Sequence, residues 1–87
     1  MALYRVEINR RVRKKDLPAI PAKSRARIVL RIKKLAQDPY PTDSIQLKGR
    51  NERRIRQGDY RILYLVQEDI VTVFVIKVGH RKEIYRK

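Results

Sequence analysis

Apolar and polar residues alternate over residues 3–8 (LYRVEI), near the start of the chain. A period of two is typical of a strand with one buried face, so we predict a strand here. Asn9 can then cap a short and very basic helix over residues 10–17. Pro18 ends this helix, because proline has no N–H to donate to the preceding turn.

A second helix follows, and Pro21 suits its first turn. Apolar residues recur there at intervals of three and four, which places them on one side of a helix, and most of the basic residues lie off this stripe. Residues 38–41 (DPYP) end the helix and open a loop. The apolar stripe consists of Ile28, Val29, Ile32, Leu35 and Ala36.

The second half of the chain predicts an antiparallel sheet. Residues 53–57 and 60–66 flank Gly58 and Asp59, a pair that suits a tight hairpin turn. Residues 70–78 are the most β-prone stretch and are apolar on both faces, which favours a central place in the sheet. The order β-α-α-β-β-β predicts a small α+β domain, in which two N-terminal helices pack on a mainly antiparallel sheet.

Length and composition support a single domain, residues 1–87, with a modest core. The chain holds 23 Lys and Arg against nine Asp and Glu, which gives a net charge of +14. Such an excess repels itself, so an anionic partner is expected: nucleic acid, an anionic membrane surface or an acidic protein. The hydrophobic share of 43% is too high for a disordered basic tail.

The sequence shows no targeting or redox feature. Its first residues lack the apolar stretch and cleavage site of a signal peptide. No apolar run approaches the roughly 18 residues of a membrane span. Cysteine is absent, which excludes disulfides and cysteine-based metal sites. We therefore expect a cytoplasmic protein with no membrane partner.

The predicted hairpin gathers positive charge on one face. With the turn placed as above, Arg56 stands opposite Arg61 across the two strands. Arg54 points to the same face, because it lies two residues before Arg56. Like charges in direct opposition destabilise a sheet, so we expect this cluster to bind an anion. A solvated basic face is the alternative, and a slip of one residue in the register would turn every side chain to the other face.

Basic residues of the helices and of the following loop are candidates for contacts with RNA phosphates. Each of them could instead lie on a solvated face, which is common in helices. Together they predict an electrostatic footprint for RNA or the ribosome. They are Arg10, Arg11, Arg13, Lys14, Lys15, Arg27, Arg31, Lys34 and Lys48.

The reactive side chains limit the chemistry that is available. Carboxylates are scattered, and the chain has one His and no Cys, so we predict no metal site and no nucleophilic triad. Attack of an RNA 2′-OH on its own 3′-phosphate needs neither. That reaction needs a base, cations that stabilise the charged phosphorane, and a proton donor for the departing 5′-oxygen. Arginine is suited to stabilise the charged phosphorane, and Tyr85 and His80 are the candidate bases.

Three motifs make the chain resemble the RelE/ParE superfamily of bacterial and archaeal toxins over nearly its whole length: residues 47–49 (LKG), 60–64 (YRILY) and 78–85 (VGHRKEIY). The resemblance implies a RelE-like fold. RelE-type toxins cut mRNA in the ribosomal A site, whereas ParE-type members inhibit DNA gyrase and generally lack the RNase residues. The cationic set of this chain is similar to that of the RelE branch.

The resemblance also implies roles for single residues. Arg54 and Arg56 take the family's basic-strand positions, and Arg61 takes that of its phosphate-stabilising arginine. Arg81 takes the position proposed as general acid or charge stabiliser, and Tyr85 that of the tyrosine next to the reacting 2′-OH. RelE toxins often carry lysine where Arg54 and Arg56 stand. Arginine could hardly act as a base, so these two positions should be purely electrostatic, which shifts the role of base toward Tyr85.

The partners follow from the same resemblance. It implies an acidic, RelB-like antitoxin that wraps the toxin and blocks its active site in a hetero-oligomer. The 70S ribosome and mRNA are the other implied partners, and no catalytic cofactor is implied. Since the ribosome would orient the attacking oxygen, the isolated protein should cut free RNA poorly. His80 is the reserve candidate for the base. Two alternatives are a ParE-like gyrase inhibitor and a non-catalytic RNA- or ribosome-binding module.

Overall fold

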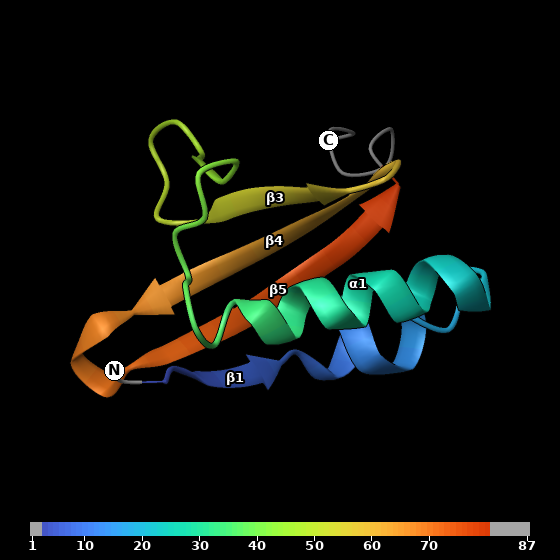
Figure 1. The fold of residues 1–87 in the computed structure, drawn as a ribbon, viewed down its shortest axis with the longest axis horizontal. Coiled ribbons are helices and arrows are strands. Elements are labelled where there is room, and N and C mark those ends of the chain that lie inside the picture. The colour runs from blue at the N-terminus through green and yellow to red at the C-terminus, as the bar shows by residue number, and fades with distance from the viewer. Residues whose placement is uncertain (1–2, 81–87) are drawn as a thin grey trace.

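A computed structural model of the protein describes residues 3–80 (Figure 1). The elements in chain order are β1 (Arg5–Ile8), η1 (Val12–Asp16), α1 (Ala22–Lys34), β2 (Ile45–Gln46), β3 (Arg53–Gln57), β4 (Tyr60–Gln67), η2 (Glu68–Ile70) and β5 (Thr72–His80). The strands form one sheet in the order β1-β5-β4-β3-β2. β1 runs parallel to β5, and the other neighbouring pairs are antiparallel. The sheet is thus mainly antiparallel, and β5 has a neighbour on each side, as predicted.

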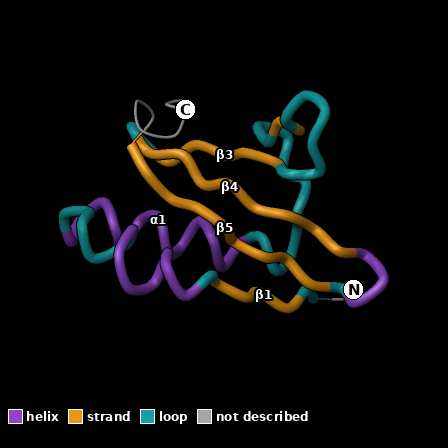
Figure 2. Tube along the Cα trace, turned by 180° about the vertical axis from the view of Figure 1, so that it is seen from behind, coloured by secondary structure: helices purple, strands orange, loops and turns teal. Residues whose placement is uncertain are grey.

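η1 and α1 cover one face of the sheet, and α1 runs along this face (Figures 1 and 2). The opposite face carries no helix within the described part of the chain. No helix within residues 3–80 is long and apolar enough to cross a membrane. From the sheet, the core takes Ile55, Ile62, Tyr64, Val73, Val75 and Val78. From the covering layer it takes Val12, Leu17, Ile20, Ile28, Ile32 and Leu35.

The first predicted helix is a short π-helical turn, η1, and not a second α-helix. The N–H of Leu17 donates to the carbonyl of Val12 at 2.8 Å, five residues back. This wider turn lets both Val12 and Leu17 reach the core, where they are 0% and 8% exposed. Asn9 accepts a hydrogen bond from the N–H of Arg11 at 2.8 Å and so caps helical residues 10–11, which lead into η1. Where two helices were predicted, the described residues before the sheet therefore form one α-helix and one short π-helical turn.

The β3–β4 hairpin has the predicted register. Gln57 pairs with Tyr60, and Arg56 pairs with Arg61. Gly58 occupies the first position of the turn with φ 62. Glycine adopts this left-handed conformation readily because it has no Cβ. The turn inferred from the sequence is confirmed.

Details of the sheet differ from the predictions, and the last strand ends at His80 rather than at residue 78. The strand β2 was not predicted. It has only two residues, too few to show an alternation of apolar and polar residues. The last strand begins at Thr72 rather than at residue 70, because Ile70 and Val71 belong to the preceding turn. Val71 takes a left-handed φ of 48 there, which a β-branched residue rarely adopts.

Candidate active site

Three arginines lie on the sheet face that α1 does not cover. Ile55 and Ile62 pair with each other across β3 and β4, and both are fully buried on the helix side. Side chains alternate along a strand, so Arg54, Arg56 and Arg61 point to the opposite face. The register thus brings the sequence-predicted arginines together.

A β-bulge adds a fourth cation to this face. The register shifts between Leu63, which pairs with Lys77, and the next residue of β4, which pairs with Val75. Ile76 is therefore an extra residue in β5. It reverses the alternation, so that Val75 and Val78 both face the core at 0% and 2% exposure, while Lys77 faces away from it. Sequence reasoning missed Lys77 because strict alternation from Val75 would turn it into the core.

We call the following four cations the basic face: Arg54, Arg56, Arg61 and Lys77. Leu63 lies between Arg54 and Lys77 in one cross-strand row. In the next row, Arg61 lies between Arg56 and Gly79, which adds no side chain. The strands β3, β4 and β5 contain no Asp or Glu.

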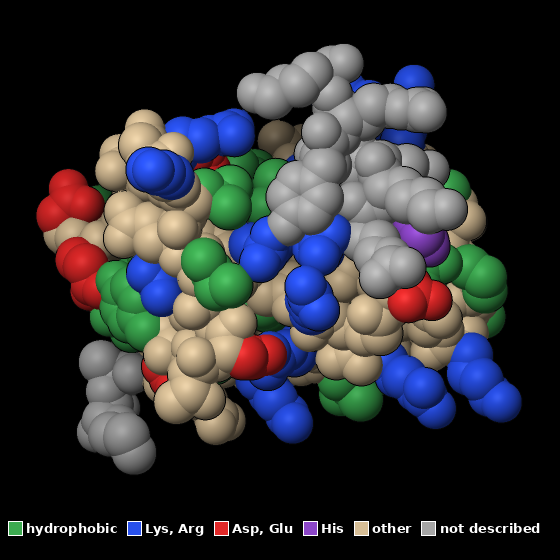
Figure 3. All heavy atoms as spheres, turned by 90° about the horizontal axis from the view of Figure 1, so that it is seen from above, with side chains coloured by type: hydrophobic (Ala, Val, Ile, Leu, Met, Phe, Trp, Pro, Cys, Tyr) green, Lys and Arg blue, Asp and Glu red, His purple; other side chains and the backbone are tan. Residues whose placement is uncertain are grey.

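Water screens the charge at the centre of the basic face poorly. Arg61 is only 6% exposed, whereas Arg56 is exposed. A charge that water screens poorly attracts an anion more strongly than an exposed charge does. Figure 3 shows Lys and Arg side chains gathered near the middle of the side of the molecule that it presents. The site can therefore hold a phosphate group through several guanidinium contacts.

His80 lies on the other face of the sheet. It pairs with Tyr60, in the row next to Arg61, and alternation turns both rings toward the helix side. The two rings meet edge to face, with centroids 5.8 Å apart and an interplanar angle of 81°. They line a cavity of about 310 Å³ together with Asp16. The structure therefore does not bring this candidate base onto the basic face.

Two residues that are central to the predicted chemistry, Arg81 and Tyr85, lie outside the described residues, so their roles stay predictions. Within residues 3–80, no group of three or more His, Asp or Glu side chains is placed to hold a metal ion. The described part of the site is thus a set of cations on a sheet. Such a set can stabilise negative charge that develops on a phosphate.

Most residues predicted to contact RNA are found away from the basic face, in and next to the helical layer. Four of them line an open hollow of about 550 Å³ together with Asn9: Arg10, Arg11, Lys14 and Lys15. Other exposed members of the set are Arg13, Arg27, Lys34 and Lys48. Arg31 is partly buried and forms an ion pair with Asp43. The protein therefore carries positive charge on both sides of its sheet.

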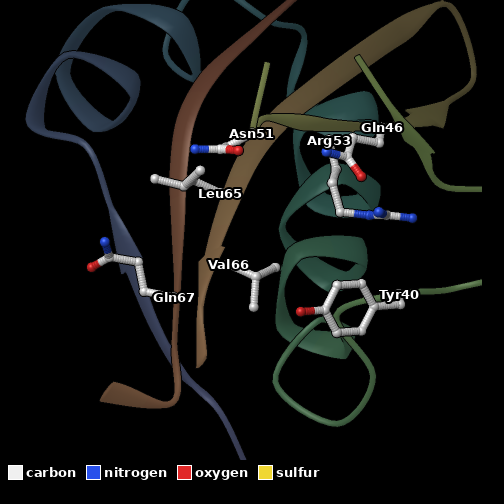
Figure 4. A pocket seen from close by; sticks show the side chains of 7 residues that line it. All are labelled: Tyr40, Gln46, Asn51, Arg53, Leu65, Val66 and Gln67. Carbon is white, nitrogen blue, oxygen red and sulfur yellow. The ribbon is translucent and has the colours of Figure 1, made fainter. Parts of the chain in front are cut away.

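A polar hollow of about 270 Å³ lies near the end of β3 that is remote from the hairpin turn (Figure 4). The guanidinium of Arg53 stacks over the ring of Tyr40, 5.0 Å from its centroid. Arg53 also donates to the hydroxyl of Ser44 at 2.8 Å. Its Nε is buried without a hydrogen-bond partner among the described residues. These contacts fasten the loop after α1 to the sheet.

Glu68, at the start of η2, accepts hydrogen bonds from the hydroxyls of Tyr40 and Tyr4, the latter at 2.7 Å. These bonds, that of Tyr40 first, hold the pKa of Glu68 below its ordinary value of 4.5. Burial, and then the bond to Glu68, raises the pKa of Tyr40 to about 12. The hydrogen bond to Glu68 raises the pKa of Tyr4. The cluster joins η2 to the segment before β1 and to the loop after α1, so we assign it a structural role.

Comparison with known proteins identifies the family. A family model described as the ParE toxin of type II toxin–antitoxin systems, parDE, matches residues 6–85. The chain therefore belongs to this toxin family, in the superfamily that includes the RelE-type toxins. The resemblance inferred from the motifs is confirmed.

Relatives of known name point to the RelE branch. Putative toxin RelE1 of Methanocaldococcus jannaschii is 31% identical over 87 residues, which cover 95% of this chain and 96% of the relative. Toxin RelG of Mycobacterium tuberculosis is 44% identical over 32 residues, only 37% of each chain. The archaeal RelE in the crystal structure of the RelE–RelB complex from Pyrococcus horikoshii OT3 superposes with a TM-score of 0.80 at 30% identity, covering 91% of this chain and 96% of that one. The chain is a RelE-like toxin with the RelE fold.

Proposed function

We propose that this RelE-like toxin inhibits translation as a ribosome-dependent endoribonuclease, which cuts mRNA in the ribosomal A site without a metal ion. The basic face carries the proposal. It places three arginines and one lysine on the side of the sheet that α1 does not cover, and the strands β3, β4 and β5 contain no acidic residue. Fixed positive charge of this kind stabilises a phosphate that gains negative charge in the transition state.

In the proposed reaction, the 2′-oxygen attacks the adjacent phosphorus and the bond to the 5′-oxygen breaks. The products are a 2′,3′-cyclic phosphate and a 5′-hydroxyl. Arg61 and Arg56 lie side by side across the hairpin, so both guanidiniums can contact the phosphorane. Neither can accept the proton of the 2′-OH. Tyr85 is the proposed base, since His80 faces the helix side.

The proposed partners account for the rest of the charge. The ribosome would align the attacking oxygen with the phosphorus, which can lower the barrier by about 7–11 kcal/mol. The exposed cations in and next to the helical layer lie across the sheet from the basic face, so they can contact ribosomal RNA while the basic face meets mRNA. The Pyrococcus RelE is found in complex with RelB. We propose that an acidic, RelB-like antitoxin likewise binds this chain in the cytoplasm.

A ParE-like inhibitor of DNA gyrase is the second candidate, and the family model favours it. An inhibitor that acts only by binding a protein has no need of cations crowded around one phosphate. Opposed arginines destabilise a sheet, so a sheet that keeps them is better explained by a phosphate-binding role. We rank the nuclease first for this reason.

A translation reaction with one defined mRNA separates the two functions. The 5′ ends of the mRNA are mapped with and without ribosomes, for the parent protein and for Arg56→Ala, Arg81→Ala and Tyr85→Phe. Lys33→Ala is the matched control, because it removes one exposed charge from α1 that is not among the residues predicted to contact RNA. We expect ribosome-dependent, codon-phased cuts that fall by about 10²-fold or more in Tyr85→Phe and persist in the control. Intact mRNA beside blocked gyrase supercoiling would support the second candidate.

A further inference from the structure

We propose that Lys77 is a catalytic residue that donates a proton to the departing 5′-oxygen. This inference rests on the proposed nuclease function and extends it. Nothing in the family resemblance assigns this position a role.

The bulge at Ile76 is what brings Lys77 to the site. An extra residue leaves its backbone unpaired and disrupts the ladder, and such bulges are common beside active sites, where they re-aim a side chain. β5 lies between β1 and β4 and is otherwise apolar from Val73 to Val78. A partly buried lysine is unfavourable in such a strand unless its ammonium has a polar role.

The position of Lys77 suits a phosphate held by Arg61. Lys77 stands directly opposite Leu63, and Arg61 lies two residues before Leu63 on the same face. Diagonal neighbours of this kind are about 7–8 Å apart, within reach of long side chains. A phosphate held by Arg61 is therefore within reach of the side chain of Lys77.

Proton chemistry separates Lys77 from the other cations of the basic face. The guanidiniums of Arg54, Arg56 and Arg61 stay protonated in proteins. A lysine ammonium can give up a proton and recover it, and so serves as a general acid. Among the four cations of the basic face, Lys77 alone can do this. Arg81, also an arginine, is better suited to stabilise charge.

Each bond and proton in this step is accounted for. The 2′-oxygen forms a bond to phosphorus and its proton passes to the base. The P–O5′ bond breaks with its electron pair on the 5′-oxygen. Nζ of Lys77 donates a proton to this oxygen, which leaves a neutral amine that water reprotonates. The products are again the 2′,3′-cyclic phosphate and the 5′-hydroxyl.

Two variants separate proton donation from charge. Lys77→Arg keeps the positive charge but cannot donate the proton, and Lys77→Met keeps an unbranched apolar stem without charge. Each is assayed with programmed ribosomes on two mRNAs, which carry either the natural 5′-oxygen or a bridging 5′-sulfur at the scissile bond. Sulfur departs as a thiolate and needs no proton. The single-turnover cleavage rate is measured, and thermal unfolding selects variants that fold like the parent.

We expect both variants to cut the oxygen substrate about 10²- to 10⁴-fold more slowly than the parent and to approach its rate on the sulfur substrate. The assignment fails if Lys77→Arg cuts the oxygen substrate at the parent rate, because charge alone then suffices. It also fails if folded variants are slowed equally on both substrates. A parent protein that leaves both mRNAs intact refutes the proposed function itself. A parent that cuts, with variants that match it, refutes only the role of Lys77.

Discussion

Removing one of the two opposed arginines should stabilise the fold. Arg56→Gln removes one charge from the pair with Arg61 and keeps a polar side chain on the strand. Opposed like charges change the stability of a sheet by about 0.2–1 kcal/mol. Because Arg61 is only 6% exposed, water screens its charge poorly, and we expect the upper half of this range.

This gain corresponds to a measurable shift in the thermal midpoint. Unfolding entropy of about 2.1 cal/mol/K per residue gives about 180 cal/mol/K for 87 residues. A gain of about 0.6–1 kcal/mol then raises the midpoint by about 3–6 °C. The assay is thermal unfolding by circular dichroism in low salt, repeated in about 1 M salt, where the Debye length falls to about 3 Å and the gain should shrink.

Arg27→Gln is the matched control, because Arg27 is exposed on α1 and has no cross-strand partner. It lowers the net charge by the same amount. An equal rise of the thermal midpoint in both variants would show that the lower net charge causes the effect. No rise in Arg56→Gln would refute the reasoning that the pair is repulsive. The stabilised variant should also cut mRNA more slowly than the parent, as expected where a strained site serves function.

Three further predictions concern the scaffold. Val71 has a φ of 48, which costs a β-branched residue about 1–2 kcal/mol and is tolerated better by asparagine. Val71→Asn should therefore raise the free energy of unfolding in urea by about 1 kcal/mol, whereas Ile70→Asn should not; a loss in Val71→Asn would show that Val71 is unstrained. Tyr64→Phe removes a buried hydrogen bond of 2.7 Å to the carbonyl of Pro39 and should lower the free energy of unfolding by about 1–3 kcal/mol; unchanged stability would contradict this. The pKa of Glu68 is below 4.5 in the folded protein, so the stabilisation by Glu68 is full above pH 4.5 and is lost as the pH falls through the folded pKa. Glu68→Gln should thus be less stable than the parent at pH 7 and match it in acid, and equal thermal midpoints at pH 7 would count against the cluster.

The arginine cluster could be predicted because two short-range signals agree. Gly58 and Asp59 define a tight turn, and a tight turn sets the pairing of the strands beside it. The apolar residues Ile55 and Ile62 then mark the buried face. Local chemistry alone was enough to place Arg56 opposite Arg61.

Lys77 and His80 could not be placed in this way, because their faces depend on a bulge. The extra residue Ile76 has no local signature, and one inserted residue reverses every later side chain in the strand. A lysine within an otherwise apolar strand was the available signal. The signal for the π-helical turn was the spacing of Val12 and Leu17, which lie five residues apart and are both buried.

The central claim is that the basic face stabilises a phosphate attacked by its own 2′-OH. The most direct test is a programmed ribosome whose mRNA carries one 2′-deoxynucleotide, at the residue that supplies the attacking oxygen. We predict that the parent protein leaves this bond intact, while it cuts the unmodified mRNA to give a 2′,3′-cyclic phosphate end. Cleavage of the 2′-deoxy bond at the unmodified rate would contradict the claim.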